Sequence, residues 1–245
     1  MAINDTTILD KKTHRVRRVW ELLSGLHQVN IHESMSDIIY KDIIRKIYGR
    51  ELKQGQRITE AQIIKEFHVS SIPVREAILK LERDGWLERI PNKGSFVRDY
   101  RDKEKLKELF LIRKSIELGA FYSLAKRSTE KQLASLEDLI RAVETAYEKK
   151  QLNQYREADS IFHYTAVLYA NGRQMEEYFE QILLKCFAFV DAPENPEEFM
   201  KYPLETHHPT HRDILKALQE KDVLLTLQLV DEHSSSGARE AGINL

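Results

Sequence analysis

Residues 58–97 have the sequence ITEAQIIKEFHVSSIPVREAILKLERDGWLERIPNKGSFV, which decides the fold of the N-terminal part of the chain. Apolar residues recur at helical spacing in its first two-thirds, and two short strand-like runs follow, joined by a Pro-Asn-Lys-Gly turn. The order predicted is helix, tight turn, helix and hairpin, which is that of a winged helix-turn-helix. Folds of this kind place one helix in a groove of DNA, so this stretch predicts a DNA-binding domain.

The elements around this stretch can be predicted from caps and apolar spacing. We expect helices over about 36–48, 59–67 and 71–83, and strands over 86–90 and 95–97. Ser70 caps the third helix, and Pro73 lies in its first turn, where a missing N–H has no consequence. The spacing predicts that the buried face of this helix is Val74, Ala77, Ile78 and Leu81.

The remainder of the chain predicts helices only. We expect them near 103–126, 130–149, 151–170, 173–189, 206–220 and 222–235, with a short one around 197–201. The fold class is therefore mainly α. Three domains are expected, namely an N-terminal arm (1–33), a winged helix-turn-helix (34–100) and an all-helical bundle (101–245). A bundle of this size can enclose a ligand cavity.

Composition and charge limit the classes of function. Of the 245 residues, 42% are hydrophobic and 31% are charged, as in a globular protein. The single cysteine, Cys186, suits a reducing cytoplasm, and we see neither a signal peptide nor a membrane span. Residues 1–99 carry 18 Lys and Arg against 14 Asp and Glu, whereas residues 100–245 carry 20 against 25. Opposite charges favour two domains with different partners.

The third helix and the hairpin resemble a known family. The residues concerned are Val69-Ser-Ser-Ile-Pro-Val-Arg-Glu-Ala-Ile78, Leu81-Glu82, Asp84-Gly85 and Asn92-Lys-Gly-Ser-Phe-Val97. They resemble the DNA-binding domain of GntR-type bacterial transcription regulators. The helical remainder resembles the effector domain of the FadR-like branch, the FCD domain, in its shorter VanR-like version. The resemblance implies a homodimer that binds a double-stranded DNA operator.

Candidate DNA contacts lie at the start of the third helix and at the hairpin tip. We expect Arg75 to contact a base or a phosphate, and Ser70 and Ser71 to contact phosphates. Ile72 has two alternatives, a thymine methyl or a neighbouring helix. The hairpin candidates are Asn92, Lys93 and Gly94. The family usually has Arg-Thr where this chain has Ser71-Ile72, so an atypical operator is expected.

Candidate metal ligands lie in the helical part. Asp159 and His163 are four residues apart and share one helix face, and His211 and His233 each lie near an apolar stripe. Each histidine alone is more typical of a core or surface position. Together, the four resemble the Asp-His-His-His set of metal-binding members of this branch. Three imidazoles and a carboxylate suit a divalent transition metal, Zn²⁺ or Ni²⁺ first. His207 and His208 compete with His211, which we prefer because it begins the clear apolar repeat.

Two further residues resemble effector-binding positions of the branch. Arg113 matches an arginine that faces the cavity and could bind a ligand carboxylate through two hydrogen bonds. Its alternative is an ion pair with Glu117, four residues further on. Asn171 matches a recurrent asparagine, and its alternative is a helix C-cap. A small organic acid is therefore the expected effector.

The predicted function is a ligand-responsive transcription regulator, most simply a repressor, and not an enzyme. Three alternatives remain open. The ion itself could be the signal, the helical domain could only dimerise, or it could be a metal-dependent hydrolase. The hydrolase alternative finds no support in the sequence, which contains neither an HExxH motif nor a nucleophile elbow.

Overall fold

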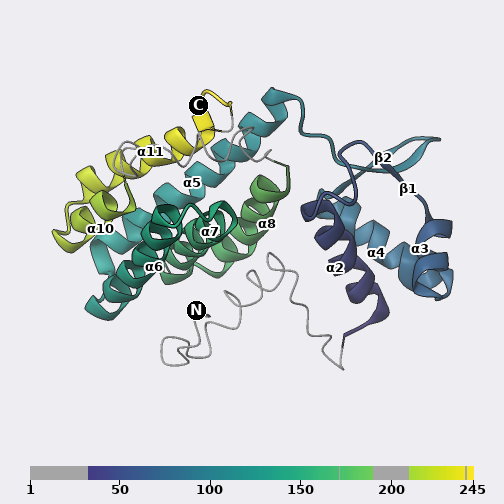
Figure 1. Cartoon of the computed structure of the whole chain (residues 1–245), viewed down its shortest axis with the longest axis horizontal. Coiled ribbons are helices and arrows are strands. Elements are labelled where there is room, and N and C mark those ends of the chain that lie inside the picture. Colours follow the sequence, from purple (N-terminus) through teal and green to yellow (C-terminus); the bar gives the residue numbers. More distant parts are fainter. Residues whose placement is uncertain (1–32, 171, 190–209, 241) are drawn as a thin grey trace. The chain divides into compact units, whose positions relative to one another are not determined.

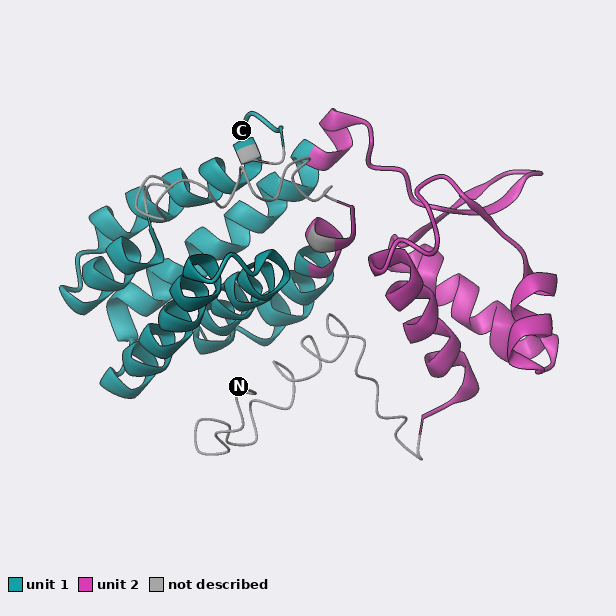
Figure 2. Ribbon diagram, viewed as in Figure 1, with its two compact units in different colours: residues 1–20, 107–183, 191–245 teal, residues 21–106, 184–190 magenta. Residues whose placement is uncertain are grey.

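The computed structural model describes residues 33–170, 172–189, 210–240 and 242–245. They fall into two compact units, which Figure 2 distinguishes by colour. Of the described residues, the winged-helix unit comprises 33–106 with 184–189, and the helical unit comprises 107–170, 172–183, 210–240 and 242–245. The expected short helix at 197–201 and residues 1–32 of the expected arm lie outside the described residues.

The winged-helix unit contains three helices and three strands among its described residues. In chain order these are α2 (Met35–Tyr48), β1 (Arg57–Ile58), α3 (Glu60–Phe67), α4 (Ser71–Arg83), β2 (Leu87–Ile90) and β3 (Gly94–Val97). Ser34 caps α2 by accepting a hydrogen bond from the Asp37 N–H, and Thr59 forms a capping box with Gln62 at α3. The three helices agree with the sequence prediction to within one residue.

The sheet of this unit has the order β1-β3-β2, with both pairs antiparallel. Gly94 pairs with Ile90, so β3 begins one residue earlier than predicted. The sequence did not predict β1 at all, because a strand of two residues is too short to show alternation. Figure 1 labels β1 and β2 beside α3 and α4 of the same unit; along the chain, β1 lies between α2 and α3, and β2 follows α4.

The core of the unit forms between α2 and α4. Four isoleucines of α2 are buried, namely Ile39, Ile43, Ile44 and Ile47. They face the buried side of α4, which consists of the four predicted residues Val74, Ala77, Ile78 and Leu81. Trp86 is fully buried beside this core, and its ring lies 5.8 Å from that of Phe189 in the same unit. Burial of these apolar side chains holds α4 in place and leaves its opposite face in solvent.

The helical unit consists of six helices among its described residues. They are α5 (Lys103–Arg127), α6 (Glu130–Glu148), α7 (Leu152–Tyr169), α8 (Arg173–Phe189), α10 (His211–Gln219) and α11 (Val223–Glu240). The first residues of α5 and the last residues of α8 group with the winged-helix unit. Helix α11 ends five residues later than predicted, because Ser235 and Ala238 continue its buried face.

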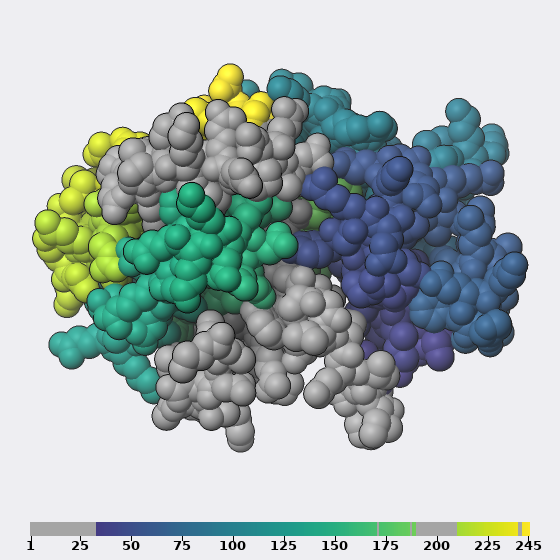
Figure 3. All heavy atoms as spheres, in the orientation of Figure 1, coloured from purple at the N-terminus to yellow at the C-terminus, as the bar shows by residue number. Residues whose placement is uncertain are grey.

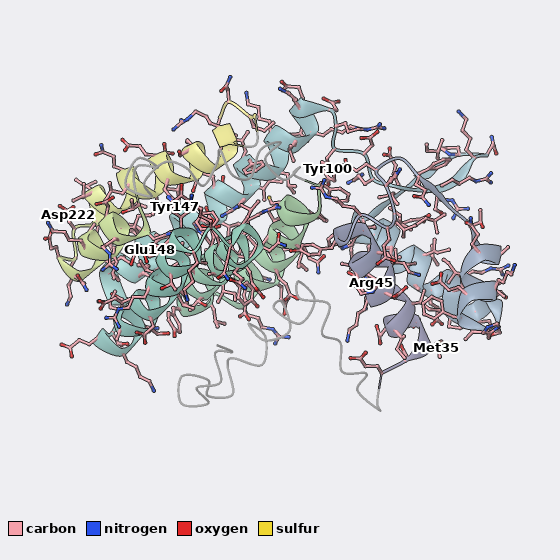
Figure 4. All side chains as sticks on the ribbon, in the orientation of Figure 1. Met35, Arg45, Tyr100, Tyr147, Glu148 and Asp222 are labelled. Carbon is pink, nitrogen blue, oxygen red and sulfur yellow. The ribbon has the colours of Figure 1, made fainter. Side chains whose placement is uncertain are left out.

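Local contacts fix the turns between these helices. Tyr147, labelled with Glu148 at the end of α6 in Figure 4, packs edge-on against Tyr155 of α7 at 5.3 Å between ring centroids. Asp222, labelled between α10 and α11, accepts a hydrogen bond from the Leu225 N–H at 3.0 Å. Helices α10 and α11 pack against each other, and their yellow-green residues gather at the left of the space-filling view in Figure 3. No helix in the described part of the chain is both long and apolar enough to cross a membrane.

Candidate metal centre and nucleic-acid interface

Four side chains from three helices converge inside the helical unit. Asp159 and His163 lie one turn apart on α7, His211 is the first residue of α10, and His233 lies on α11. One ligand atom from each of the four lies within 4.8 Å of all the others. The structure therefore brings together all four residues that the sequence singled out as metal ligands.

Local sequence explains how His211 is held. Thr210 and Asp213 form a capping box that starts α10 at His211, and Leu215, one turn further on, is buried in the core. The buried ring of Phe162 lies 4.3 Å from the His211 ring. Aromatic packing and a fixed helix start together orient His211 toward α7. His207 and His208, its competitors in the sequence, lie outside the described residues.

The distances between the ligand atoms test whether a metal fits. His163 Nε2 lies 3.3 Å from His211 Nε2 and 3.2 Å from His233 Nε2. Asp159 Oδ1 lies 3.2 Å from His211 Nε2 and 3.7 Å from His163 Nε2. Bonds of about 2.0–2.1 Å in a tetrahedral zinc site place neighbouring ligand atoms about 3.3 Å apart. The four side chains therefore fit a first-row divalent ion in donor type and in spacing.

A buried carboxylate lies behind His163. Glu117 of α5 is completely buried, and its Oε1 lies 3.0 Å from His163 Nδ1, although the contact lacks the angle of a regular hydrogen bond. Glu117 also accepts hydrogen bonds from Arg113 Nε at 2.9 Å and from Ser234 Oγ at 2.8 Å. A carboxylate on one imidazole nitrogen favours the tautomer whose other nitrogen can bind a metal.

The cluster is electrostatically suited to a cation. Burial raises the pKa of Asp159, but His163 and His211 outweigh it and hold this pKa well below its usual range. Burial also raises the pKa of Glu117, and Arg113 with His163 reverses the effect. Burial lowers the pKa of His163, yet Glu117 and Asp159 raise it to about 9. Two carboxylates thus stabilise positive charge at His163, where a proton and a metal ion compete.

The two expected effector residues have different outcomes. Arg113 makes the ion pair with Glu117 that was one of its two alternatives, and its side chain is 15% exposed. Glu117 thus contacts Arg113 on one side and His163 on the other. The role of Arg113 toward a ligand stays a prediction. Asn171 lies outside the described residues.

The candidate DNA contacts lie on exposed surface of the winged-helix unit. Ser70 is the N-cap of α4 without a side-chain cap hydrogen bond, and Ser71 begins the helix. Ile72 is 68% exposed, and the Arg75 side chain is 64% exposed. Arg75 Nε donates to Glu60 Oε2 of α3 at 2.9 Å. The first turns of α4 therefore present a serine pair, an apolar side chain and an oriented guanidinium to solvent.

The hairpin tip presents a second exposed group. Asn92, Lys93 and Gly94 are all exposed, and Asn92 and Gly94 have φ angles of +61° and +102°. A glycine suits the second angle, which residues with a Cβ rarely adopt. Arg57, on the neighbouring strand β1, is exposed beside Gly94. The sequence prediction missed Arg57 together with its strand.

Comparisons with known proteins agree with this fold. The family model for bacterial regulatory proteins of the gntR family matches residues 35–97, and the FCD domain model matches residues 108–236. The HTH-type transcriptional repressor RspR of Escherichia coli K12 is 29% identical over 195 residues, covering 80% of this chain and 83% of RspR. The HTH-type transcriptional regulator McbR of the same strain is 26% identical over 194 residues, covering 78% and 85%.

Solved structures support the fold as well. That of E. coli McbR/YncC superposes with a TM-score of 0.66 at 22% identity, covering 86% of this chain and 98% of the other. A putative GntR regulator from Rhodococcus sp. RHA1 also gives 0.66, at 20% identity and coverage of 86% and 99%.

A winged helix-turn-helix joined to an all-helical FCD domain defines a DNA-binding transcription regulator. The chain belongs to the GntR family of bacterial regulators, in the branch that carries the FCD domain. Its relatives are regulators and not enzymes, so the chain is not an enzyme and the hydrolase alternative is wrong.

Proposed function

We propose that the chain is a ligand-responsive repressor that acts in the cytoplasm as a homodimer on a double-stranded DNA operator. The single observation that carries the ligand-responsive part is the convergence of Asp159, His163, His211 and His233 inside the helical unit. Repression is supported by the similarity to RspR, which is described as a transcriptional repressor. We propose a homodimer because two-fold symmetry doubles the DNA contacts that one small domain can make.

DNA recognition is assigned to α4 and the hairpin tip. Arg75 hydrogen-bonds a guanine edge or a phosphate, and Glu60 holds the guanidinium in position before DNA binds. The backbone N–H groups at the start of α4, with Ser70 and Ser71, bind a phosphate. Ile72, which has more than half of its surface exposed, contacts a thymine methyl. Lys93 approaches the backbone beside the minor groove.

The metal is assigned to the four clustered side chains. Zn²⁺ or Ni²⁺ suits three imidazole nitrogens and a carboxylate. The bound ion supplies a positive centre that attracts an anionic ligand. We propose that Arg113 and Asn171 contact a small carboxylate near this centre, with Glu117 keeping Arg113 and His163 in place.

The proposed response is a shift between two conformations. A carboxylate that binds one conformation of the helical domain better than the other changes their populations by its difference in affinity. Operator affinity then changes by the same coupling free energy, typically about 1–3 kcal/mol. Release from the operator on ligand binding is the expected direction.

A thermal-shift experiment tests this function. The full chain is stripped with a chelator, reloaded with Zn²⁺ or Ni²⁺ and screened against mono-, di- and tricarboxylic acids. At least one acid should raise the melting temperature of the reloaded protein only, and should weaken binding to a DNA fragment selected from a random library. If no acid changes either quantity, the carboxylate effector is rejected.

One observation favours a second function, in which the ion itself is the signal. The Asp159–His211 and His–His separations match a tetrahedral site already filled by four protein atoms. A filled site has no open position for a carboxylate. DNA affinity that follows free Zn²⁺ or Ni²⁺ concentration without any acid would select this metal-sensing alternative.

A further inference from the structure

Helix α5 exposes an apolar stripe on the side opposite its buried face. Leu109, Phe110, Ala120, Phe121 and Leu124 of this helix are buried. The exposed side nevertheless carries three large apolar residues, since Leu111 is 43% exposed, Ile112 48% and Tyr122 43%. A helix that is apolar on both sides is typical of one buried on both sides in the working assembly.

The exposed positions follow one another at helical spacing. From the N-terminal end they are Glu108, Ile112, Ser115, Gly119, Tyr122 and Lys126, all of them exposed. Steps of three and four residues keep these side chains on one face of the helix. We name these six residues the α5 stripe. It extends over about 27 Å, at the usual rise per residue of an α-helix.

The chemistry of the α5 stripe is symmetric about its centre. The two small residues, Ser115 and Gly119, lie in the middle, and a large apolar residue flanks each of them. An acidic residue, Glu108, stands at one end and a basic residue, Lys126, stands at the other. Each pair is equally distant from Glu117 along the chain, which lies on the buried side.

This pattern fits a second copy of the same helix. A two-fold axis perpendicular to α5 at the centre of the stripe places the helix antiparallel to its copy. Glu108 of one copy then meets Lys126 of the other, and Ile112 meets Tyr122, each pair twice. Ser115 meets Gly119, which lets the two backbones approach closely. A parallel pairing would place like charges together at both ends.

Local contacts prepare the stripe for this role. The Ser115 hydroxyl donates to the Leu111 carbonyl oxygen at 2.8 Å, so it presents a small surface whose polar hydrogen is already bonded. Lys126 Nζ lies 4.3 Å from the centre of the Tyr122 ring, which orders both residues. A Cβ on Gly119 would lie 3.3 Å from Met175 Cε of α8.

We propose that the α5 stripe is the self-association surface of the chain, with two α5 helices packed antiparallel about a two-fold axis. This inference rests on the homodimer under Proposed function and adds where the copies meet. The occupant is a second copy of the chain, because the order of charges and side-chain sizes along the stripe is complementary to its own reverse. No other partner would require that symmetry.

Sedimentation of the full chain tests the surface. The wild type should be a dimer at micromolar concentration, and Ile112→Arg should weaken dimerisation about a hundredfold or more, since two charges enter the contact. Leu224→Arg is the matched control, because Leu224 is 82% exposed on α11, outside the stripe, and should stay dimeric. Circular dichroism checks that both variants fold.

A charge exchange tests the antiparallel order while keeping the large apolar residues of the stripe. Glu108→Lys and Lys126→Glu should each weaken the dimer about threefold to tenfold, and the double variant should recover wild-type affinity. A wild type that is dimeric and insensitive to Ile112→Arg overturns the surface alone. A double variant no better than either single one overturns the antiparallel order. A monomeric wild type overturns the proposed homodimer and the surface together.

Discussion

The α4 face and the Asp-His cluster differ in how the fold treats their polar groups. On α4, Arg75 and Ile72 are more than half exposed, and the fold orients their side chains without burying them. In the cluster, His163 is 2% exposed and contacts Asp159, Glu117 and two further histidines. Exposed groups can exchange solvent for DNA without disturbing the core. Buried groups are coupled, so a change at one of them should be felt throughout the helical unit.

The largest expected effect is loss of the proposed metal in His163→Ala. His163 Nε2 lies 3.3 Å from His211 Nε2, 3.2 Å from His233 Nε2 and 3.7 Å from Asp159 Oδ1. Its removal therefore opens the centre of the cluster. Metal affinity should fall by more than the roughly 10–100-fold typical of an outer-shell change. Metal analysis of the purified chain measures it. His208→Ala is the matched control and should keep its metal; retention in His163→Ala would contradict the assignment.

The next effect is smaller and concerns Glu117→Gln. The amide removes the negative charge that Arg113 and His163 share, so His163 should bind a metal less strongly. We expect a 10–100-fold loss of Zn²⁺ affinity, about the range for outer-shell partners, measured by competition with a chromophoric chelator. Ser234→Ala, which removes only the neutral partner of Glu117, should lose far less. Equal losses in the two variants would argue against a role for the charge.

On the exposed side of the comparison, Arg75→Ala should weaken operator binding and leave metal content unchanged. Loss of a base contact corresponds to about 1–3 kcal/mol, and the loss should be greatest for one base pair of the site. Fluorescence anisotropy with a selected DNA fragment measures it. Arg141→Ala, an exposed arginine paired with Glu137 on α6, is the control. An equal effect of both variants would remove Arg75 from the interface.

The smallest effect is expected for Lys93→Ala at the hairpin tip. A phosphate contact carries no sequence information, so binding should weaken to a similar extent on all DNA sequences. The slope of log affinity against log salt should fall by about one unit. Titrations at several salt concentrations give that slope. An unchanged slope would place Lys93 away from the phosphates.

The winged-helix unit and the Asp-His cluster also differ in how much of each could be predicted from the sequence. The α4 face could be predicted almost completely, because local periodicity separates Val74, Ala77, Ile78 and Leu81 from the exposed residues. Strand β1 and Arg57 could not, because two residues carry no pattern and their pairing with β3 is non-local. Asp159 and His163 share a helix turn, but their meeting with His211 and His233 depends on packing of distant helices, and only family resemblance suggested it.

Glu117 is a single residue whose contacts could not be predicted from the sequence for the same reason. In the sequence it is simply the residue four positions after Arg113, and the ion pair given there as one of two alternatives does form. Its contacts with His163 of α7 and Ser234 of α11 arise from packing between helices far apart in the chain. A buried acidic residue in an apolar helix signals a partner, but burial itself is known only from the fold.

Anomalous diffraction at the zinc edge, from crystals of the full chain loaded with Zn²⁺, tests the central claim most directly. The account predicts one peak per chain, about 2.0–2.2 Å from Asp159 Oδ1 and from the Nε2 atoms of His163, His211 and His233. A peak bound instead by His207 or His208, or no peak in the helical unit, would contradict it.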